Sequence, residues 1–93
     1  MDTSVMNMFD LSNDVAIVTG AGRGIGEGIA TTLARAGAAV VCAARRSEEV
    51  ERVAGDIRAA GGRAIAVPTD VTDDDAVQRL VDRAAQAGKV RSW

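Results

Sequence analysis

The sequence predicts an α/β fold built on a parallel β-sheet. Three short apolar runs recur at residues 15–18, 39–42 and 64–67, and each is followed by a segment with helical periodicity. The runs do not alternate with polar residues, which is typical of strands buried on both faces of a sheet. The repeated order of strand and helix therefore predicts a right-handed βαβαβα layout with parallel strands.

The first helix is expected soon after the first apolar run. Ile25, Ile29 and Leu33 stand four residues apart and would form its buried stripe. Gly37 follows the last of them, and a glycine in this place can adopt the left-handed conformation that ends many helices.

The second helix is expected to be capped by Ser47, whose hydroxyl can accept from the free N–H groups of the first turn. Glu48 and Glu49 suit the positive end of the helix dipole, and the pair Gly61 and Gly62 would end the helix. The expected apolar stripe consists of Val50, Val53, Ala54 and Ile57.

The third helix is expected to be capped by Thr72, with Asp75 in the position of a capping-box acid. We interpret the acidic run 73–75 as charges that meet the helix dipole, not as a cation site. Gly88 follows the expected last turn. The apolar stripe consists of Val77, Leu80, Val81 and Ala84.

The length of 93 residues suits one small domain, which we expect to span 1–93 with a loose lead-in at 1–8. Residues 9–11 would pack two apolar side chains against the sheet. Residues 88–90 look like the approach to a fourth strand, but the sequence ends at Trp93. We therefore expect a sheet truncated after the third helix. Its open first-strand edge and uncovered second face would promote self-association.

Composition narrows the class of function. With 47% hydrophobic and 26% charged residues the chain is typical of a globular protein, and it contains no apolar run of the ~20 residues that a membrane span needs. The N-terminus lacks the pattern of a secretory signal. A net charge of −2 gives no basic field for nucleic acid or acidic lipid. One cysteine, Cys42, excludes an intrachain disulfide and fits a cytoplasmic location.

The absence of certain residue types is equally informative. The chain has no His and no Tyr, and its sole Lys is Lys89. Histidine metal ligands, histidine general bases and a Tyr–Lys proton-transfer pair within these 93 residues are therefore excluded, and we expect no metal site.

The most informative segment is 19–26, Thr-Gly-Ala-Gly-Arg-Gly-Ile-Gly, which joins the first strand to the first helix. The N-terminus of a helix presents unpaired N–H groups and a partial positive charge, both of which favour phosphate. Glycines let the backbone turn sharply and approach a pyrophosphate, and Gly26 can bring the helix close to the strand. A plain turn would not need four glycines. The segment predicts the phosphate-binding loop of a Rossmann-type fold.

The glycine spacing separates classes of nucleotide-binding loop. A P-loop would need Gly, four residues, Gly, then Lys and Ser or Thr, which this loop lacks. The spacing G-x-G-x-x-G also fails, because it would place a glycine where Ile25 stands. The pattern present is T-G-x-x-x-G-x-G.

That pattern resembles the cofactor loop of the short-chain dehydrogenase/reductase family. Thr19, Gly20, Gly24 and Gly26 match its positions, and the resemblance covers roughly residues 9–87. It implies that the loop wraps the pyrophosphate of a dinucleotide cofactor. The candidate contacts in the loop are Gly20, Gly22, Arg23, Gly24, Ile25 and Gly26. It also implies that Asp70, with the backbone of Val71 beside it, binds near the adenine.

The residues after the second strand address the choice between NAD and NADP. An acid there would bind both ribose hydroxyls, whereas an arginine suits a 2′-phosphate. The chain has Arg45 and Arg46 there and no acid, and Arg23 in the loop could bind the same phosphate. We favour NADP over NAD, with Arg45 as the stronger candidate. The alternative is that both arginines are solvated charges facing Glu48 and Glu49.

The resemblance implies an oxidoreductase acting on an alcohol or a carbonyl. The family's catalytic Ser and its Tyr-x-x-x-Lys motif lie further along than this sequence reaches, so we name no catalytic residue and expect the chain to be inactive alone. The first alternative is a non-catalytic nucleotide-binding or self-associating module. A methyltransferase-like fold for S-adenosylmethionine ranks third, because it would want an acid where Arg45 stands.

Overall fold

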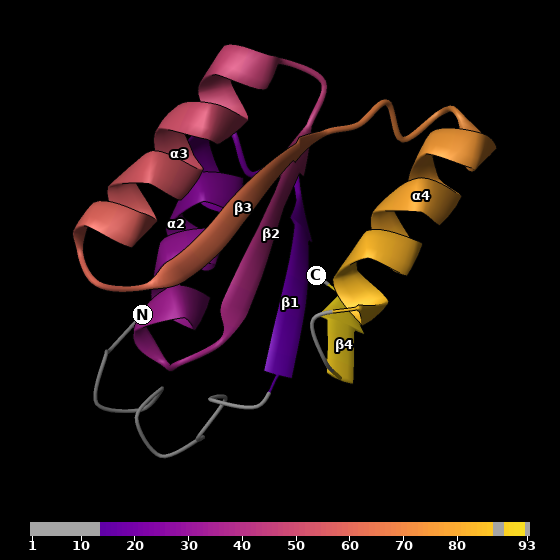
Figure 1. Ribbon diagram of the computed structural model, residues 1–93. Helices are drawn as coiled ribbons and strands as arrows, with labels where there is room; N and C mark the ends of the chain where they lie inside the picture. Colours follow the sequence, from indigo (N-terminus) through magenta and orange to yellow (C-terminus); the bar gives the residue numbers. More distant parts are fainter. Residues whose placement is uncertain (1–13, 87–88, 93) are drawn as a thin grey trace.

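The structure, a computed structural model, describes residues 14–86 and 89–92 (Figure 1). Strands and helices alternate along this part of the chain, as the apolar runs predict. The strands are β1 (Asp14–Thr19), β2 (Ala39–Ala44), β3 (Arg63–Pro68) and β4 (Lys89–Ser92). The helices are α2 (Gly24–Arg35), α3 (Ser47–Ala59) and α4 (Asp74–Ala85).

The strands form one parallel sheet in the order β3-β2-β1-β4. The registers place Val18 beside Cys42 and Cys42 beside Ala66, so the carboxyl ends of the first three strands meet at one edge. The sequence predicts a sheet that is truncated after the third helix, but the sheet of the structure is longer. It continues into β4, which pairs with β1 from Asp14 to Ile17.

The expectation that the edge of the first strand lies open is therefore wrong. β1 has a hydrogen-bonded neighbour on both sides, and within the described residues β3 and β4 are the outer strands. The physical reason is that the four residues Lys89–Ser92 pair through their backbone, which requires no apolar run. Most of β1 is consequently a central strand.

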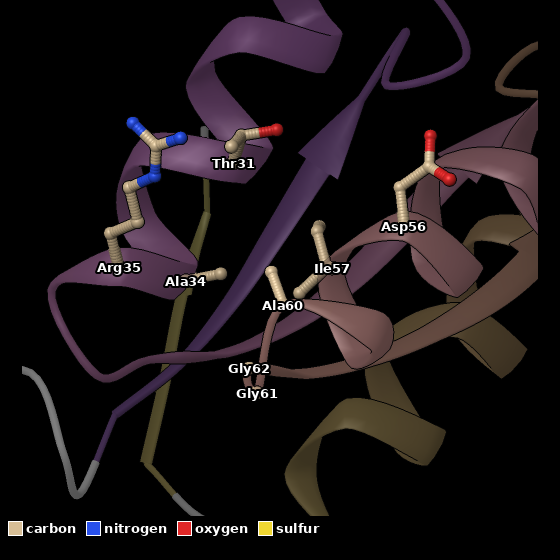
Figure 2. A pocket seen from close by; sticks show the side chains of 8 residues that line it. All are labelled: Thr31, Ala34, Arg35, Asp56, Ile57, Ala60, Gly61 and Gly62. Atoms are coloured by element: carbon tan, nitrogen blue, oxygen red, sulfur yellow. The ribbon is translucent and has the colours of Figure 1, made fainter.

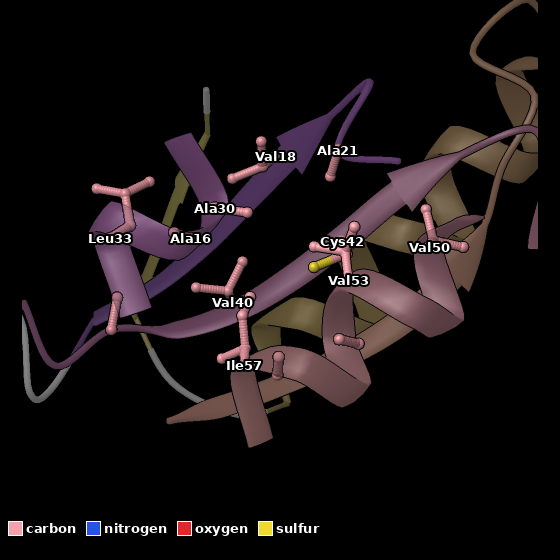
Figure 3. Close-up of a cluster of buried hydrophobic side chains, with 13 residues drawn as sticks. Ala16, Val18, Ala21, Ala30, Leu33, Val40, Cys42, Val50, Val53 and Ile57 are labelled. Atoms are coloured by element: carbon pink, nitrogen blue, oxygen red, sulfur yellow. The ribbon is translucent and has the colours of Figure 1, made fainter. Parts of the chain in front are cut away.

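Both faces of the sheet carry a core. Helices α2 and α3 lie over one face, where Figure 3 shows Val40 and Cys42 of β2 facing Ile57 and Val53 of α3, and Val18 of β1 beside Ala30 of α2. Helix α4 covers part of the other face. The buried side chains there are Val15, Ile17, Val41, Ala43, Leu80 and Ala84. Successive residues of β1 thus point to opposite cores, which confirms strands buried on both sides.

The helix ends confirm part of the prediction and correct part of it. Gly37 and Gly61 adopt φ of 104° and 91° just beyond α2 and α3, as helix-ending glycines should. Ser47 is the first residue inside α3, and its side chain does not cap it. Asp73, and not Thr72, caps α4, because the Asp73 carboxylate accepts from the N–H groups of residues 75 and 76. This supports the interpretation of the acidic run as a helix start.

Two expected core positions are exposed. Ile25 was assigned to the buried stripe of the first helix but is 84% exposed, because it lies in the first turn of α2, beyond the end of β1. Val81 is 40% exposed on α4. The expectations for residues 1–11 and for Gly88 fall outside the described residues.

Cys42 lies in the core beneath α3 and shows no sign of reactivity. Burial raises the pKa of its thiol to about 11, against a smaller opposing effect of the positive charge of Arg58. The thiol is therefore protonated at neutral pH and behaves as a small hydrophobic group.

Candidate functional site

The glycine loop between β1 and α2 requires glycine for its backbone shape. Gly20 and Gly24 have φ of 66° and 62°, in the left-handed region that side chains rarely adopt. The N–H of Ala21 donates to the carbonyl of Ala43 at 3.2 Å, which ties the loop to the end of β2. The loop therefore turns sharply across the carboxyl edge of the sheet.

The other two glycines allow close approach. A Cβ at Gly26 would collide with the carbonyl of Gly20, so the first turn of α2 packs directly on the residue that follows β1. A Cβ at Gly22 would lie 2.8 Å from Oε2 of Glu49, on the first turn of α3. The sequence predicts the close packing at Gly26, whereas the contact with Glu49 was not foreseen.

Helix α2 presents its N-terminus at this loop. The first N–H groups of a helix have no intrahelical partner, and they carry the positive end of its dipole. Arg23 occupies the cap position with an extended backbone, and its side chain does not cap the helix. These N–H groups suit an anion such as a pyrophosphate.

A cleft of about 730 Å³ opens beside the loop, at the carboxyl ends of β1, β2 and β3. This is the edge where parallel α/β sheets place their ligands. Its walls come from the glycine loop, the turns after β2 and β3, and α4. The lining residues are Thr19, Gly20, Gly22, Arg23, Ala44, Arg45, Arg46, Glu49, Thr69, Val71, Val77 and Leu80.

Six of the predicted site residues are thus brought together. Gly24, Ile25, Gly26 and Asp70 do not line the cleft, although the first three belong to the adjoining first turn of α2. The residues that sequence reasoning missed come mainly from later turns and from α4. Of these, Glu49, Thr69 and Leu80 lie 23 or more positions beyond the loop, so nothing local in the sequence indicates their contact with the cleft.

Three arginines line the cleft. Within residues 14–86, no carboxylate forms an ion pair with Arg23, Arg45 or Arg46. In this part of the chain, Arg45 and Arg46 form no ion pair with Glu48 or Glu49, and both arginines are exposed, as the alternative of solvated charges also expects. All three guanidinium groups are exposed and remain able to bind an anion.

Asp70 uses its carboxylate to shape the turn after β3. Its Oδ1 accepts from the Thr72 hydroxyl at 2.6 Å and from the Thr72 N–H at 2.9 Å. These hydrogen bonds, assisted by the charge of Arg45, lower the pKa of Asp70. The turn exposes Val71, 54% accessible, on the wall of the cleft. Asp70 therefore supports the wall without lining it.

A second hollow lies at the opposite end of α2 and α3. Figure 2 shows Thr31, Ala34 and Arg35 of α2 across from Asp56 and Ile57 of α3, around about 500 Å³. It adjoins Gly61 and Gly62, at the end of the sheet remote from the glycine loop. It shares no residue with the cleft.

The fold and the glycine loop together define a Rossmann-type nucleotide-binding protein. In the described part of the chain, no helix is long and apolar enough to cross a membrane.

Comparison with known proteins gives the family. Residues 14–91 match the model of the short chain dehydrogenase family. An uncharacterised oxidoreductase of Mycobacterium tuberculosis is 43% identical over 83 residues, which cover 89% of this chain and 32% of that protein. Versicolorin reductase of Emericella nidulans is 46% identical over 79 residues, covering 84% of this chain and 30% of the reductase.

Solved structures agree with this comparison. A hydroxysteroid dehydrogenase from Escherichia coli superposes with a TM-score of 0.81 at 41% identity, over 86% of this chain and 34% of that one. A metagenomic short-chain oxidoreductase in complex with NADP gives 0.80 at 39% identity, over 87% and 38%.

The chain belongs to the short-chain dehydrogenase/reductase family, whose members are oxidoreductases that bind NAD(P). It spans about one third of the length of the relatives that it matches.

Proposed function

We propose that this chain is the NADP(H)-binding portion of a short-chain dehydrogenase/reductase that oxidises an alcohol or reduces a carbonyl. The observation that carries the proposal is the placement of three arginines, which form no ion pair within the described residues, around a cleft that also meets the N-terminus of α2. A dinucleotide would supply or accept a hydride. The residues described here bind and orient it.

Two parts of the cleft suit two different phosphate groups of the cofactor. The glycine loop and the free N–H groups of α2 suit the pyrophosphate, because they offer backbone donors and no side chain in the way. Arg45 and Arg46 follow β2, where the adenosine ribose is expected, and Arg23 faces the same cleft. The cationic groups at this position support NADP over NAD, since they can form charge-assisted hydrogen bonds with a 2′-phosphate.

The 93 residues offer no proton-transfer group suited to the reaction. With no Tyr and no His in the sequence, we propose that this chain alone does not turn over a carbonyl substrate.

Asp70 and Val71 support the adenine side of the cleft, and Ile25 presents an apolar side chain beside the loop. Because the single cysteine forms no intrachain disulfide, which fits a reducing compartment, we propose that the protein acts in the cytoplasm.

Calorimetric titration with NADP⁺ and NAD⁺ tests the proposal, with Arg45→Ala as the informative variant. The affinity for NADP⁺ should fall roughly tenfold to a hundredfold, the value of a hydrogen bond to a charged group, whereas NAD⁺ binding should change little. Arg79→Ala removes an exposed arginine of α4 that does not line the cleft, and it should leave both affinities unchanged. Equal affinity of the unaltered chain for both nucleotides would contradict the preference for NADP.

A second candidate function is a non-catalytic nucleotide-binding module that self-associates. The observation that favours it is the pair of outer strands, β3 and β4, each with one unpaired edge in the described sheet. Assembly that depends on added nucleotide would support this alternative, and nucleotide binding by a monomer would oppose it.

A further inference from the structure

Arg52 reaches from the middle of α3 to the glycine loop. Its Nη2 donates to the carbonyl of Gly22 at 3.3 Å and to Oε1 of Glu27 at 3.0 Å. Its Nη1 donates to Oε2 of Glu27 at 3.2 Å and to Asp56 at 3.4 Å. One guanidinium therefore joins the loop, the first turn of α2 and α3.

The contact is specific in geometry but weak as a source of stability. The planar fork of an arginine matches both oxygens of a carboxylate, which a lysine cannot do. The hydrogen bonds from Arg52 lower the pKa of Glu27. The Arg52 side chain is 50% exposed, however, and exposed ion pairs contribute little to folding. The effect of Arg52 is therefore to hold the loop, the first turn of α2 and α3 in place relative to one another.

The bond to Gly22 fixes the orientation of one peptide group in the loop. In a trans peptide the N–H points opposite to the C=O. Holding the Gly22 carbonyl toward Arg52 therefore holds the Arg23 N–H pointing away from Arg52. The same bond fixes the spacing between the loop and the first turn of α3, where Glu49 packs against Gly22.

Arg52 itself does not line the cleft. We propose that Arg52 is a positioning residue, which sets the affinity for the cofactor by holding the glycine loop against α3 without touching the nucleotide. This inference rests on the proposed function, because it assigns the loop to the pyrophosphate.

Titration of NADPH into three variants tests the role of Arg52. In Arg52→Met the affinity should fall roughly tenfold, the value of about one charge-assisted hydrogen bond. Arg52→Lys keeps the positive charge but loses the fork, so it should bind NADPH nearly as weakly as Arg52→Met. Arg58→Met is the matched control, because Arg58 lies on the same helix and donates to a backbone carbonyl at Ala64, 2.8 Å away and far from the loop. It should bind as the unaltered chain does.

Two outcomes of the titration would overturn the proposal. If Arg52→Lys restores full affinity, Arg52 acts through its charge and not by holding the loop. If Arg58→Met weakens binding as much as Arg52→Met, the loss reflects general damage to α3.

Hydrogen exchange gives a readout that needs no nucleotide. The amides of Ala21 and Glu27, which donate to the carbonyls of Ala43 and Arg23, should exchange faster in Arg52→Met than in Arg58→Met, with the core of α3 equally protected in both. Unchanged exchange of these two amides would overturn the positioning role, even if affinity fell. Failure of the unaltered chain to bind NADPH would instead overturn the proposed function, and the exchange of the loop would still decide whether Arg52 holds it.

Discussion

Glu49 places a carboxylate on the wall of a cleft that three arginines also line. It lies on the first turn of α3, against Gly22, and is partly buried. If NADP binds as proposed, a negative charge at this place would repel its 2′-phosphate and could accept a hydrogen bond from a ribose hydroxyl. On the proposed function, Glu49 thus opposes the preference for NADP that the arginines favour.

Removal of this charge should sharpen the preference for NADP. In Glu49→Gln the affinity for NADP⁺ should rise roughly threefold to tenfold, since a partly screened charge pair is worth about 1 kcal/mol. Glu48→Gln changes the net charge equally at an exposed neighbour that does not line the cleft, and it should have no such effect. Calorimetry with NADP⁺ and NAD⁺ measures both, and an equal gain in the two variants would argue against a local role for Glu49.

Two glycines of one helix should respond to alanine in opposite ways. At Gly26 a methyl group would strike the carbonyl of Gly20, so Gly26→Ala should destabilise the fold by about 1–3 kcal/mol and weaken nucleotide binding. Gly28 faces open space, so Gly28→Ala should stabilise α2 by about 0.5–1 kcal/mol. Urea unfolding measures both changes. A Gly26→Ala chain as stable as the original would show that the loop can yield.

The spacing of the glycine loop predicts which residues must be glycine, because backbone shape is a local property. Glu49 and Arg52 were not assigned to the site, because they lie 27 and 30 residues beyond Gly22, which they contact. In the sequence both residues look like charges on the exposed face of a helix, and no sequence pattern indicates that they face the loop. Such contacts depend on how α3 packs over the sheet.

At the scale of elements, the strands buried on both faces are the most predictable part of the fold. Their continuous apolar runs have few other structural uses in a short α/β chain. β4 was foreseen only as an approach to a strand, because Lys89–Ser92 is polar and short and its pairing with β1 depends on the rest of the sheet. The cap position of α3 lies one residue earlier than predicted, at Arg46, and no side chain caps it. The cap of α4 lies one residue later than predicted, because Asp73 and Thr72 are neighbouring polar residues that can each accept from the same N–H donors.

The cap of α4 gives a prediction at this scale. The Asp73 carboxylate accepts from the N–H groups of Asp75 at 3.0 Å and Ala76 at 3.3 Å. Asp73→Ala should therefore cost about 1 kcal/mol of stability in urea unfolding. Asp74→Ala removes a neighbouring acid that provides no cap, and it should cost less. Equal losses would mean that the charge near the dipole matters more than the cap.

At the scale of the whole molecule, the described sheet has two outer strands and only partial cover on one face. Ile65 and Val67 of β3 pack at the margin of the α4 core and are only partly buried. We therefore expect the 93-residue chain to self-associate through β3 or β4 and not through β1, which is paired on both sides for most of its length. Sedimentation velocity at rising protein concentration should show a growing sedimentation coefficient. A monomer at all concentrations would contradict this.

Because β1 lies between β2 and β4, its two pairings differ in the entropy that is lost when the chain closes a loop. Paired residues of neighbouring strands such as 15 and 39, or 39 and 63, are close in sequence, whereas residue 14 of β1 pairs with the distant residue 89 of β4. Closing a loop about three times longer costs roughly 1 kcal/mol more. The glycine loop, Arg45 and Arg52 lie in the connections between strands that pair with their neighbours in sequence, while Val77 and Leu80 lie in the connection that leads to β4, which pairs with the distant β1. The phosphate-binding corner is thus assembled from strands close in sequence, and the opposite wall of the cleft precedes the pairing that closes the longest loop.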